Sequence, residues 1–263
     1  MKKTITTVGI WIAAQLVVTM IFVIVAMVQG KDVNSILAPS LLVSDALVII
    51  LLLAMKYCGV KELVKTVPGN VFLISIIFGI CGMFAVELIS SAFEIPNMLE
   101  QQFEAMSKTI SGFLGICIIG PIMEEIMMRR IILKEMEKAT KSMWAGILIS
   151  SALFAVVHIN PIQVVFAMPA GIILGWLYCK TGSLLVPICL HILNNTISFI
   201  TIRMGSESTL SIKNTMGVVL FVALALITVV SAIWLIKNYK AMVVPESESS
   251  DSACVINTDE TPA

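Results

Sequence analysis

The stretch GFLGICIIGPIMEEIMMRRIIL, residues 112–133, carries two glutamates and two arginines inside an otherwise apolar segment. Adjacent carboxylates at membrane depth are costly unless they are paired, protonated or in contact with a wet cavity. On a helix, Glu125 and Arg129 lie four residues apart on one face, in the favourable order for an ion pair. Glu124 points about 100° away and has no cation at this spacing. The pattern predicts that Glu125 is held in an ion pair, whereas Glu124 is free to take or give a proton.

The composition around this stretch is that of a membrane protein. Hydrophobic residues make up 58% of the chain and charged residues 13%. A soluble domain carries roughly 25% charged residues, so an ordinary soluble domain is excluded. Apolar runs of about 20 residues predict an all-α, polytopic membrane helical bundle. About eight transmembrane helices are expected, near residues 8–29, 36–55, 71–93, 110–133, 143–159, 163–179, 184–201 and 216–236.

These spans divide the chain into four parts. Residues 1–109 hold about three N-terminal spans, residues 110–201 hold the polar motifs, and residues 202–240 hold the last span. Residues 241–263 are acidic and rich in Ser and Thr, so they are expected to form a disordered cytoplasmic tail.

The distribution of basic residues predicts the orientation in the membrane. With the N-terminus inside, few of the 17 basic residues fall on the outer side: Lys31, Lys108, Arg203 and Lys213. Both termini are therefore predicted to be cytoplasmic. The net charge is zero, which gives no case for nucleic acid as a partner. The six cysteines show no CxxC spacing and are interpreted as buried small hydrophobes.

The chain has only two histidines, His158 and His191, and both fall in predicted spans. The pairs Phe154/His158 and His191/Asn195 are each four residues apart, so each pair is expected to share a helix face. A single His or Asn within a span is explained by a hydrogen bond between neighbouring helices. Polar motifs on three different spans favour a catalytic constellation instead.

The three motifs E-E-x-x-x-R, F-x-x-x-H and H-x-x-x-N resemble, in this order, those of the CAAX protease and bacteriocin-processing family of intramembrane peptidases. The resemblance covers roughly residues 110–200, and the first 100 residues match nothing in it. It implies a helical membrane peptidase whose active site opens within the bilayer. The matching residues are Glu124, Glu125, Arg129, Phe154, His158, His191 and Asn195.

The resemblance also implies a role for each motif. Glu124 and His158 are expected to activate a water for attack on a peptide carbonyl, and the Glu125–Arg129 pair is expected to support them. His191 and Asn195 are then placed to stabilise the oxyanion.

The resemblance does not decide whether the protein binds a metal cofactor, because family members include metalloproteases and metal-free glutamate proteases. Glu124, His158 and His191 could be three ligands of a catalytic zinc, with water in the fourth position. The implied partner is a membrane-embedded or lipidated peptide, either a prenylated CAAX-type substrate or a bacteriocin or leader peptide.

Other readings remain beside the peptidase. A non-catalytic membrane immunity or scaffold protein would keep the motifs as polar contacts between helices. A proton-coupled transporter would also place Glu, His and Arg at mid-membrane, but the spans show no inverted repeat. Asp45 and Glu87 also fall within spans. Each could pair with an arginine, line a polar access path, or form a buried hydrogen bond.

The depth of the site sets one further expectation. His158 lies 16 residues beyond Ser142, or about 24 Å along a helix. Glu124 reaches a similar depth only if its helix continues past Arg130 to about Lys138. The intervening residues include good helix formers and no Gly or Pro, so this continuation is expected.

Overall fold

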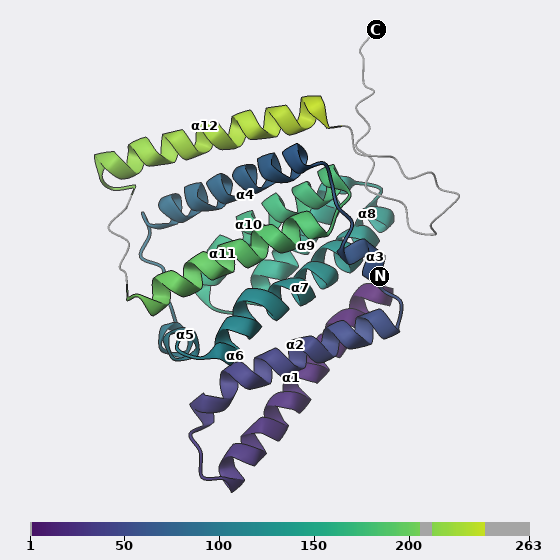
Figure 1. The fold of residues 1–263 in the computed structure, drawn as a ribbon, viewed down its shortest axis with the longest axis vertical. Helices are drawn as coiled ribbons and strands as arrows, with labels where there is room; N and C mark the ends of the chain where they lie inside the picture. Colours follow the sequence, from purple (N-terminus) through teal and green to yellow (C-terminus); the bar gives the residue numbers. More distant parts are fainter. Residues whose placement is uncertain (1, 206–211, 240–263) are drawn as a thin grey trace.

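The computed structural model describes residues 2–205 and 212–239, and Figure 1 traces their fold. Within these ranges the secondary structure is helical, without strands. Seven of the described helices are long and apolar enough to cross a membrane, and α9 is a shorter apolar helix. The protein is therefore an integral membrane protein with the predicted all-α, polytopic fold. The predicted disordered tail, residues 241–263, lies outside the described residues.

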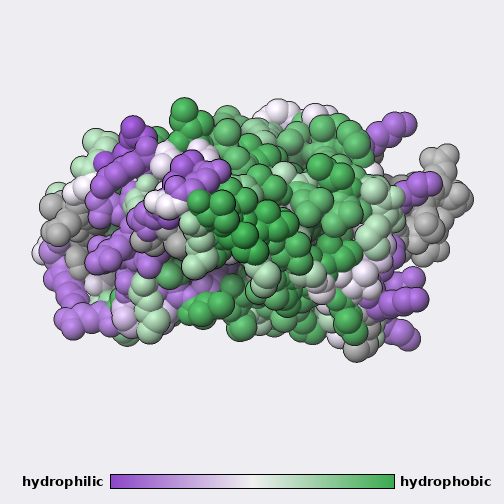
Figure 2. All heavy atoms as spheres, turned by 90° about the horizontal axis from the view of Figure 1, so that it is seen from below, coloured by the Kyte–Doolittle hydropathy of each residue, from purple (hydrophilic) through white to green (hydrophobic). Residues whose placement is uncertain are grey.

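Six of the long helices are continuous α-helices near predicted spans: α1 (Lys2–Val28), α2 (Leu37–Ala54), α4 (Gly69–Ser90), α10 (Pro161–Thr181), α11 (Leu185–Arg203) and α12 (Thr215–Asn238). Short helices lie between some of them: η1 (Val33–Ile36), α3 (Val60–Leu63) and α5 (Glu100–Ser107). Figure 2 shows hydrophobic residues gathered in a broad central band, with hydrophilic residues toward the two ends. Such a band is expected of a surface that faces lipid tails.

The seventh long helix runs from Ile110 to Thr140 and changes its winding four times. Its parts are α6 (Ile110–Gly112), η2 (Phe113–Ile119), α7 (Gly120–Glu125), η3 (Ile126–Leu133) and α8 (Lys134–Thr140), of which η2 and η3 are π-helical. The helix thus continues to Thr140, as the depth argument required. The short α7, which carries both glutamates, lies between two π-helical segments, a geometry often found at functional sites.

The end of η2 has a local cause. The Gly120 N–H bonds to the Gly115 carbonyl, five residues back, which is the π-helical spacing. A Cβ at Gly120 would lie 2.8 Å from that carbonyl oxygen, so a side chain does not fit here. Pro121 follows and has no N–H, which interrupts the regular ladder of hydrogen bonds where α7 begins.

Helix α9 (Met143–Val156) is shorter than the predicted span 143–159. Its 14 residues extend about 21 Å, less than the roughly 30 Å of a bilayer core. Ile159 has a positive φ of 60°, and α10 begins at Pro161 after this turn. His158 therefore lies in the turn between α9 and α10 rather than on a helix.

The helix of residues 110–140 occupies the middle of the bundle (Figure 1). The pair α1 and α2 packs on one side of it, whereas α4 and α12 pack together on the opposite side. Helices α9 and α10 form a close antiparallel pair that also contacts η3. Side chains of η3 are among the most buried of the described residues, including Ile126, Met127, Met128 and Ile132. The two glutamates at the end of α7 consequently face the interior of the bundle.

Candidate active site

The predicted ion pair between Glu125 and Arg129 is present and fully buried. Arg129 Nη1 lies 3.0 Å from Glu125 Oε1, and the two side chains are 1% and 0% exposed. The guanidinium also donates from Nη2 to the Gly171 carbonyl at 3.3 Å. Its Cζ lies 4.8 Å from the centre of the Phe154 ring, a cation–π contact. Arg129 is therefore fixed from three sides.

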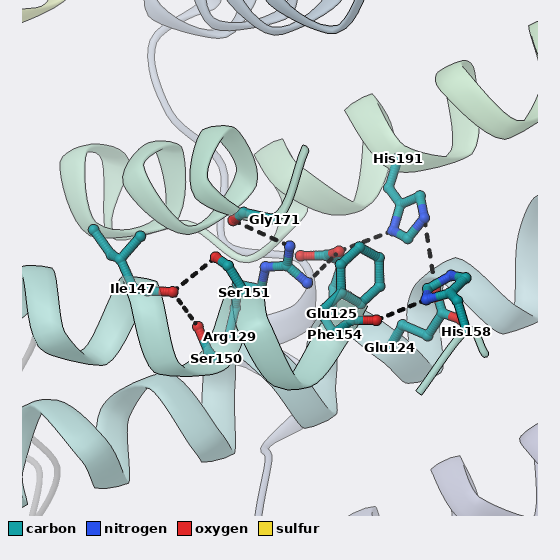
Figure 3. Close-up of polar contacts among 10 residues, drawn as sticks. All are labelled: Glu124, Glu125, Arg129, Ile147, Ser150, Ser151, Phe154, His158, Gly171 and His191. Atoms are coloured by element: carbon teal, nitrogen blue, oxygen red, sulfur yellow. Dashed lines mark hydrogen bonds and ion pairs between the residues drawn. The ribbon is translucent and has the colours of Figure 1, made fainter. Parts of the chain in front are cut away.

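His191 links the two glutamates (Figure 3). Its Nδ1 lies 2.9 Å from Glu125 Oε1, and its Nε2 lies 3.5 Å from Glu124 Oε2. Since a carboxylate oxygen accepts hydrogen bonds, the Nδ1 of His191 is the donor toward Glu125. Nε2 and the Glu124 oxygen attract each other only if a proton or a cation lies between them.

The two glutamates differ in exposure, although they are neighbours. The Glu124 side chain is 25% exposed, whereas that of Glu125 is completely buried. Residues adjacent on a helix point about 100° apart, which accounts for this difference. Glu124 is thus the carboxylate that a substrate or water can reach.

His158 is oriented by the helix that precedes it. Its Nδ1 lies 2.7 Å from the Phe154 carbonyl, and the two rings meet edge to face at 4.8 Å. A carbonyl accepts, so Nδ1 carries the hydrogen and Nε2 carries the lone pair. Figure 3 shows the side chains of His158, His191 and Glu124 pointing toward one another. The structure thus brings together the residues of the first two motifs and the histidine of the third.

Asn195 lies one turn beyond His191 on α11, but its amide is used elsewhere. The Nδ2 group donates to the Ile116 carbonyl of η2 at 3.0 Å. Asn195 Oδ1 accepts from the Asn194 amide at 3.4 Å. In this structure Asn195 therefore anchors the π-helical segment η2 to α11.

The predicted zinc ligands have the donor types of a zinc site, but the structure does not gather all three around one point. Each histidine donates from Nδ1 to an oxygen, Glu125 for His191 and the Phe154 carbonyl for His158, which leaves both Nε2 atoms as candidate ligands. Two ligands of a tetrahedral zinc lie about 3.3 Å apart, close to the 3.5 Å between His191 Nε2 and Glu124 Oε2. However, no three His, Cys, Asp or Glu side chains among the described residues are close enough to hold a metal ion in this conformation.

Two carboxylates outside the motifs lie in other membrane spans, and they differ in their surroundings. Asp45 is buried, and its Oδ1 accepts from Gln15 Nε2 of α1 at 2.8 Å. Its Oδ2 lies 3.6 Å from where a Cβ of Gly120 would be, one helical turn before Glu124. Glu87 is exposed on the surface of α4. The sequence indicates a polar residue within a span at Asp45, but it does not reveal the partner Gln15, which lies 30 residues away.

Arg130 pairs with Glu62 of α3, a partner that the sequence did not suggest. The contact is bidentate, with nitrogen–oxygen distances of 2.7 and 2.9 Å. Burial opposes ionisation of Glu62, but hydrogen bonds from Arg130 and from the Gly59 N–H hold the pKa of this carboxyl below its ordinary value. This pair fastens the α3 segment to the central helix just beyond the site.

Fold and site together define a polytopic membrane protein with a buried Glu–His–Arg centre. Residues 106–197 match the model of a family described as type II CAAX prenyl endopeptidase Rce1-like. Over 79 residues the chain is 38% identical to the protein named "Putative membrane peptidase YdiL" of Bacillus subtilis (strain 168). That alignment covers 30% of this chain and 32% of the relative. No solved structure gives a significant match. The resemblance to the CAAX protease family is confirmed for the segment that carries the three motifs.

Proposed function

We propose that this protein is an intramembrane endopeptidase that hydrolyses a peptide bond of a membrane-associated substrate with a water activated by Glu124. The observation that carries the proposal is the contrast between two adjacent glutamates. Glu125 is immobilised by Arg129 and His191, whereas Glu124 is partly exposed and faces His191. The family match over residues 106–197 and the peptidase relative support the same class of activity.

The proposed reaction uses these residues in a fixed order. Glu124 takes a proton from a water that His158 Nε2 helps to position, and the resulting hydroxide attacks the peptide carbonyl carbon. The negative charge then develops on the carbonyl oxygen, where a hydrogen on His191 Nε2 and the second hydrogen of the Asn195 amide are proposed to stabilise it. When the C–N bond breaks, Glu124 returns its proton to the leaving nitrogen. Glu125 holds His191 in orientation throughout.

Zinc remains a proposal beside the metal-free mechanism. A zinc ion held by Glu124, His158 and His191 would lower the pKa of the attacking water and polarise the carbonyl. The orienting contacts of the two histidines would serve in either case, because they fix the direction of both Nε2 atoms.

The proposed substrate is a lipidated or membrane-embedded peptide, reached from within the bilayer. The apolar helices around the site and the prenyl endopeptidase description of the matching family support this choice. A bacteriocin or leader peptide is the alternative of the same type. We further propose that both termini are cytoplasmic, as the distribution of basic residues indicates.

The test is cleavage of a quenched peptide library, prenylated and non-prenylated, by the purified protein. Glu124→Gln is expected to reduce kcat/KM by at least about 100-fold, the usual contribution of a general base, while the protein still folds. His158→Ala is expected to act in the same direction. Glu87→Gln is the matched control, because Glu87 is an exposed carboxylate on another span.

Each outcome separates the competing functions. Loss of cleavage in Glu124→Gln, with normal cleavage by Glu87→Gln, supports the peptidase. If wild type and Glu124→Gln have equal activity in cells, the enzymatic proposal is wrong and an immunity or scaffold role takes its place. Repeating the assay with a strong chelator distinguishes the zinc mechanism from the metal-free one.

A further inference from the structure

Helix α1 carries a row of polar side chains on its buried side. Thr7, Trp11 and Gln15 follow one another at intervals of four residues and therefore share one face of the helix. Helix α1 packs against α2 and against the π-helical segment η3. The rest of α1 is strongly apolar, so a polar row facing the bundle calls for an explanation.

The two ends of this row are fixed by contacts. At the first end, the Glu135 carboxylate of α8 accepts hydrogen bonds from the Lys3 and Thr4 N–H groups and from the Thr4 hydroxyl. At the other end, Gln15 donates to Asp45, whose second oxygen faces Gly120 of α7. The row thus begins at the rim of the bundle, at the N-terminus of α1.

The depths of the two ends agree. Gln15 lies 11 residues beyond Thr4, and Glu124 lies 11 residues before Glu135. The first distance is about 16 Å along α1. The Gln15–Asp45 hydrogen bond and the approach of Asp45 to Gly120 place Gln15 within about one helical turn of Glu124. The row therefore leads from the rim to the depth of the catalytic carboxylate.

Two polar atoms in the row lack a protein partner. Thr7 is 0% exposed, and its hydroxyl makes no hydrogen bond. Its half-buried neighbour Thr6 instead bonds back to the Lys2 carbonyl, so the orphaned hydroxyl is particular to the fully buried position. The buried Trp11 Nε1 likewise makes no hydrogen bond within the protein. Buried polar atoms without protein partners are usually satisfied by bound water.

From these contacts we infer that Thr7, Trp11, Gln15 and Asp45 form a hydration path that carries water from the rim at Thr4 to Glu124. The inference rests on the proposed function, because hydrolysis consumes one water for each bond cleaved. Water inside a protein binds at buried polar groups, whereas apolar cavities stay dry. The path belongs to α1 and α2 and lies outside residues 106–197, the segment that the family model matches.

Thiol labelling tests the path without reference to activity. Single cysteines are introduced at Thr7, at Gln15 and, as the control, at Ala14, which is buried and adjacent to Gln15 on the same helix. The full-length protein in lipid vesicles is exposed to a charged thiosulfonate reagent, and peptide mass spectrometry separates the new sites from the native cysteines. Only a hydrated thiol ionises and reacts, so Thr7→Cys and Gln15→Cys are expected to react at least about tenfold faster than Ala14→Cys. Equal rates at all three positions would overturn the inference.

A second comparison links the path to turnover. Thr7→Val removes the hydroxyl with little change of shape and is expected to lower kcat several-fold with KM unchanged. Thr6→Val makes the same change at the half-buried neighbouring position, whose hydroxyl bonds to its own helix, and is expected to leave kcat unchanged. Labelling at Thr7→Cys and Gln15→Cys together with equal activity of wild type and Glu124→Gln in cells would reject the peptidase but keep the path. Glu124-dependent cleavage with no labelling at Thr7→Cys or Gln15→Cys would reject the path but keep the peptidase.

Discussion

Replacing Glu125 by Gln is expected to destabilise the fold strongly. Glu125 is 0% exposed and lies 3.0 Å from a guanidinium that is itself 1% exposed. Glu125→Gln leaves the buried charge of Arg129 without its counter-ion, and breaking a buried pair in this way costs about 3–5 kcal/mol. At about 2–4 °C per kcal/mol for a chain of this size, the thermal midpoint is expected to fall by about 6–20 °C.

The neighbouring substitution gives the matched comparison. The Glu124 side chain is 25% exposed, and its nearest partner, His191 Nε2, is 3.5 Å away. Glu124→Gln removes no counter-ion from a buried cation, so its effect on the free energy of unfolding is expected to stay within about 1 kcal/mol. The two variants thus separate stability from activity at adjacent positions.

The assay is thermal unfolding of the purified variants in detergent, followed by circular dichroism. The double variant Glu125→Gln/Arg129→Gln is expected to recover part of the loss, because neither charge is then left buried alone. The reasoning fails if Glu125→Gln unfolds within about 2 °C of wild type, less than the shift expected for 1 kcal/mol. It also fails if Glu124→Gln is the less stable of the two single variants.

Three further predictions concern the surroundings of the site. Glu62→Gln removes the bidentate partner of Arg130 and, since Glu62 is 43% exposed, is expected to cost only about 1 kcal/mol. Folding lowers the pKa of Glu62, so this contribution to stability is present above the ordinary Glu pKa of about 4.3 and is lost as pH falls below it. Unfolding curves of wild type and Glu62→Gln across pH test this. Gly171→Ala places a Cβ 2.9 Å from Ser151 Cβ and is expected to cost about 1–3 kcal/mol, whereas Gly9→Ala meets no neighbour and is expected to be neutral or stabilising in the same melting assay. If zinc is bound, metal analysis of the purified protein finds about one ion per chain, and its removal by a chelator lowers the thermal midpoint.

The fold class and one central contact could be predicted from the sequence. Apolar runs of about 20 residues locate the spans, because a membrane imposes a minimum length on every helix that crosses it. The Glu125–Arg129 pair follows from a spacing of four residues on one helix. The continuation of this helix to Thr140 followed from the depth of His158. Each of these inferences uses local spacing or a fixed membrane thickness.

The remaining parts depend on contacts between distant segments. Nothing in the local sequence distinguishes π-helical from α-helical winding in residues 113–119 and 126–133. The early end of α9 at Val156 was missed because apolar residues continue past it. The contacts of His191 with both glutamates join residues 66 and 67 positions apart, so no periodicity reveals them.

The adjacent glutamates divide two roles, buried support and access to substrate, that a single carboxylate would combine poorly. A buried Arg129 needs a fixed negative partner, and His191 needs an acceptor that sets the direction of its ring. A carboxylate held for both purposes is inaccessible to substrate, as the complete burial of Glu125 demonstrates. A second carboxylate one residue earlier points about 100° away, and so it reaches His191 Nε2 while keeping a quarter of its surface open. The helix thus places a fixed and an accessible carboxylate on opposite sides of one imidazole, and this arrangement depends on both glutamates being neighbours.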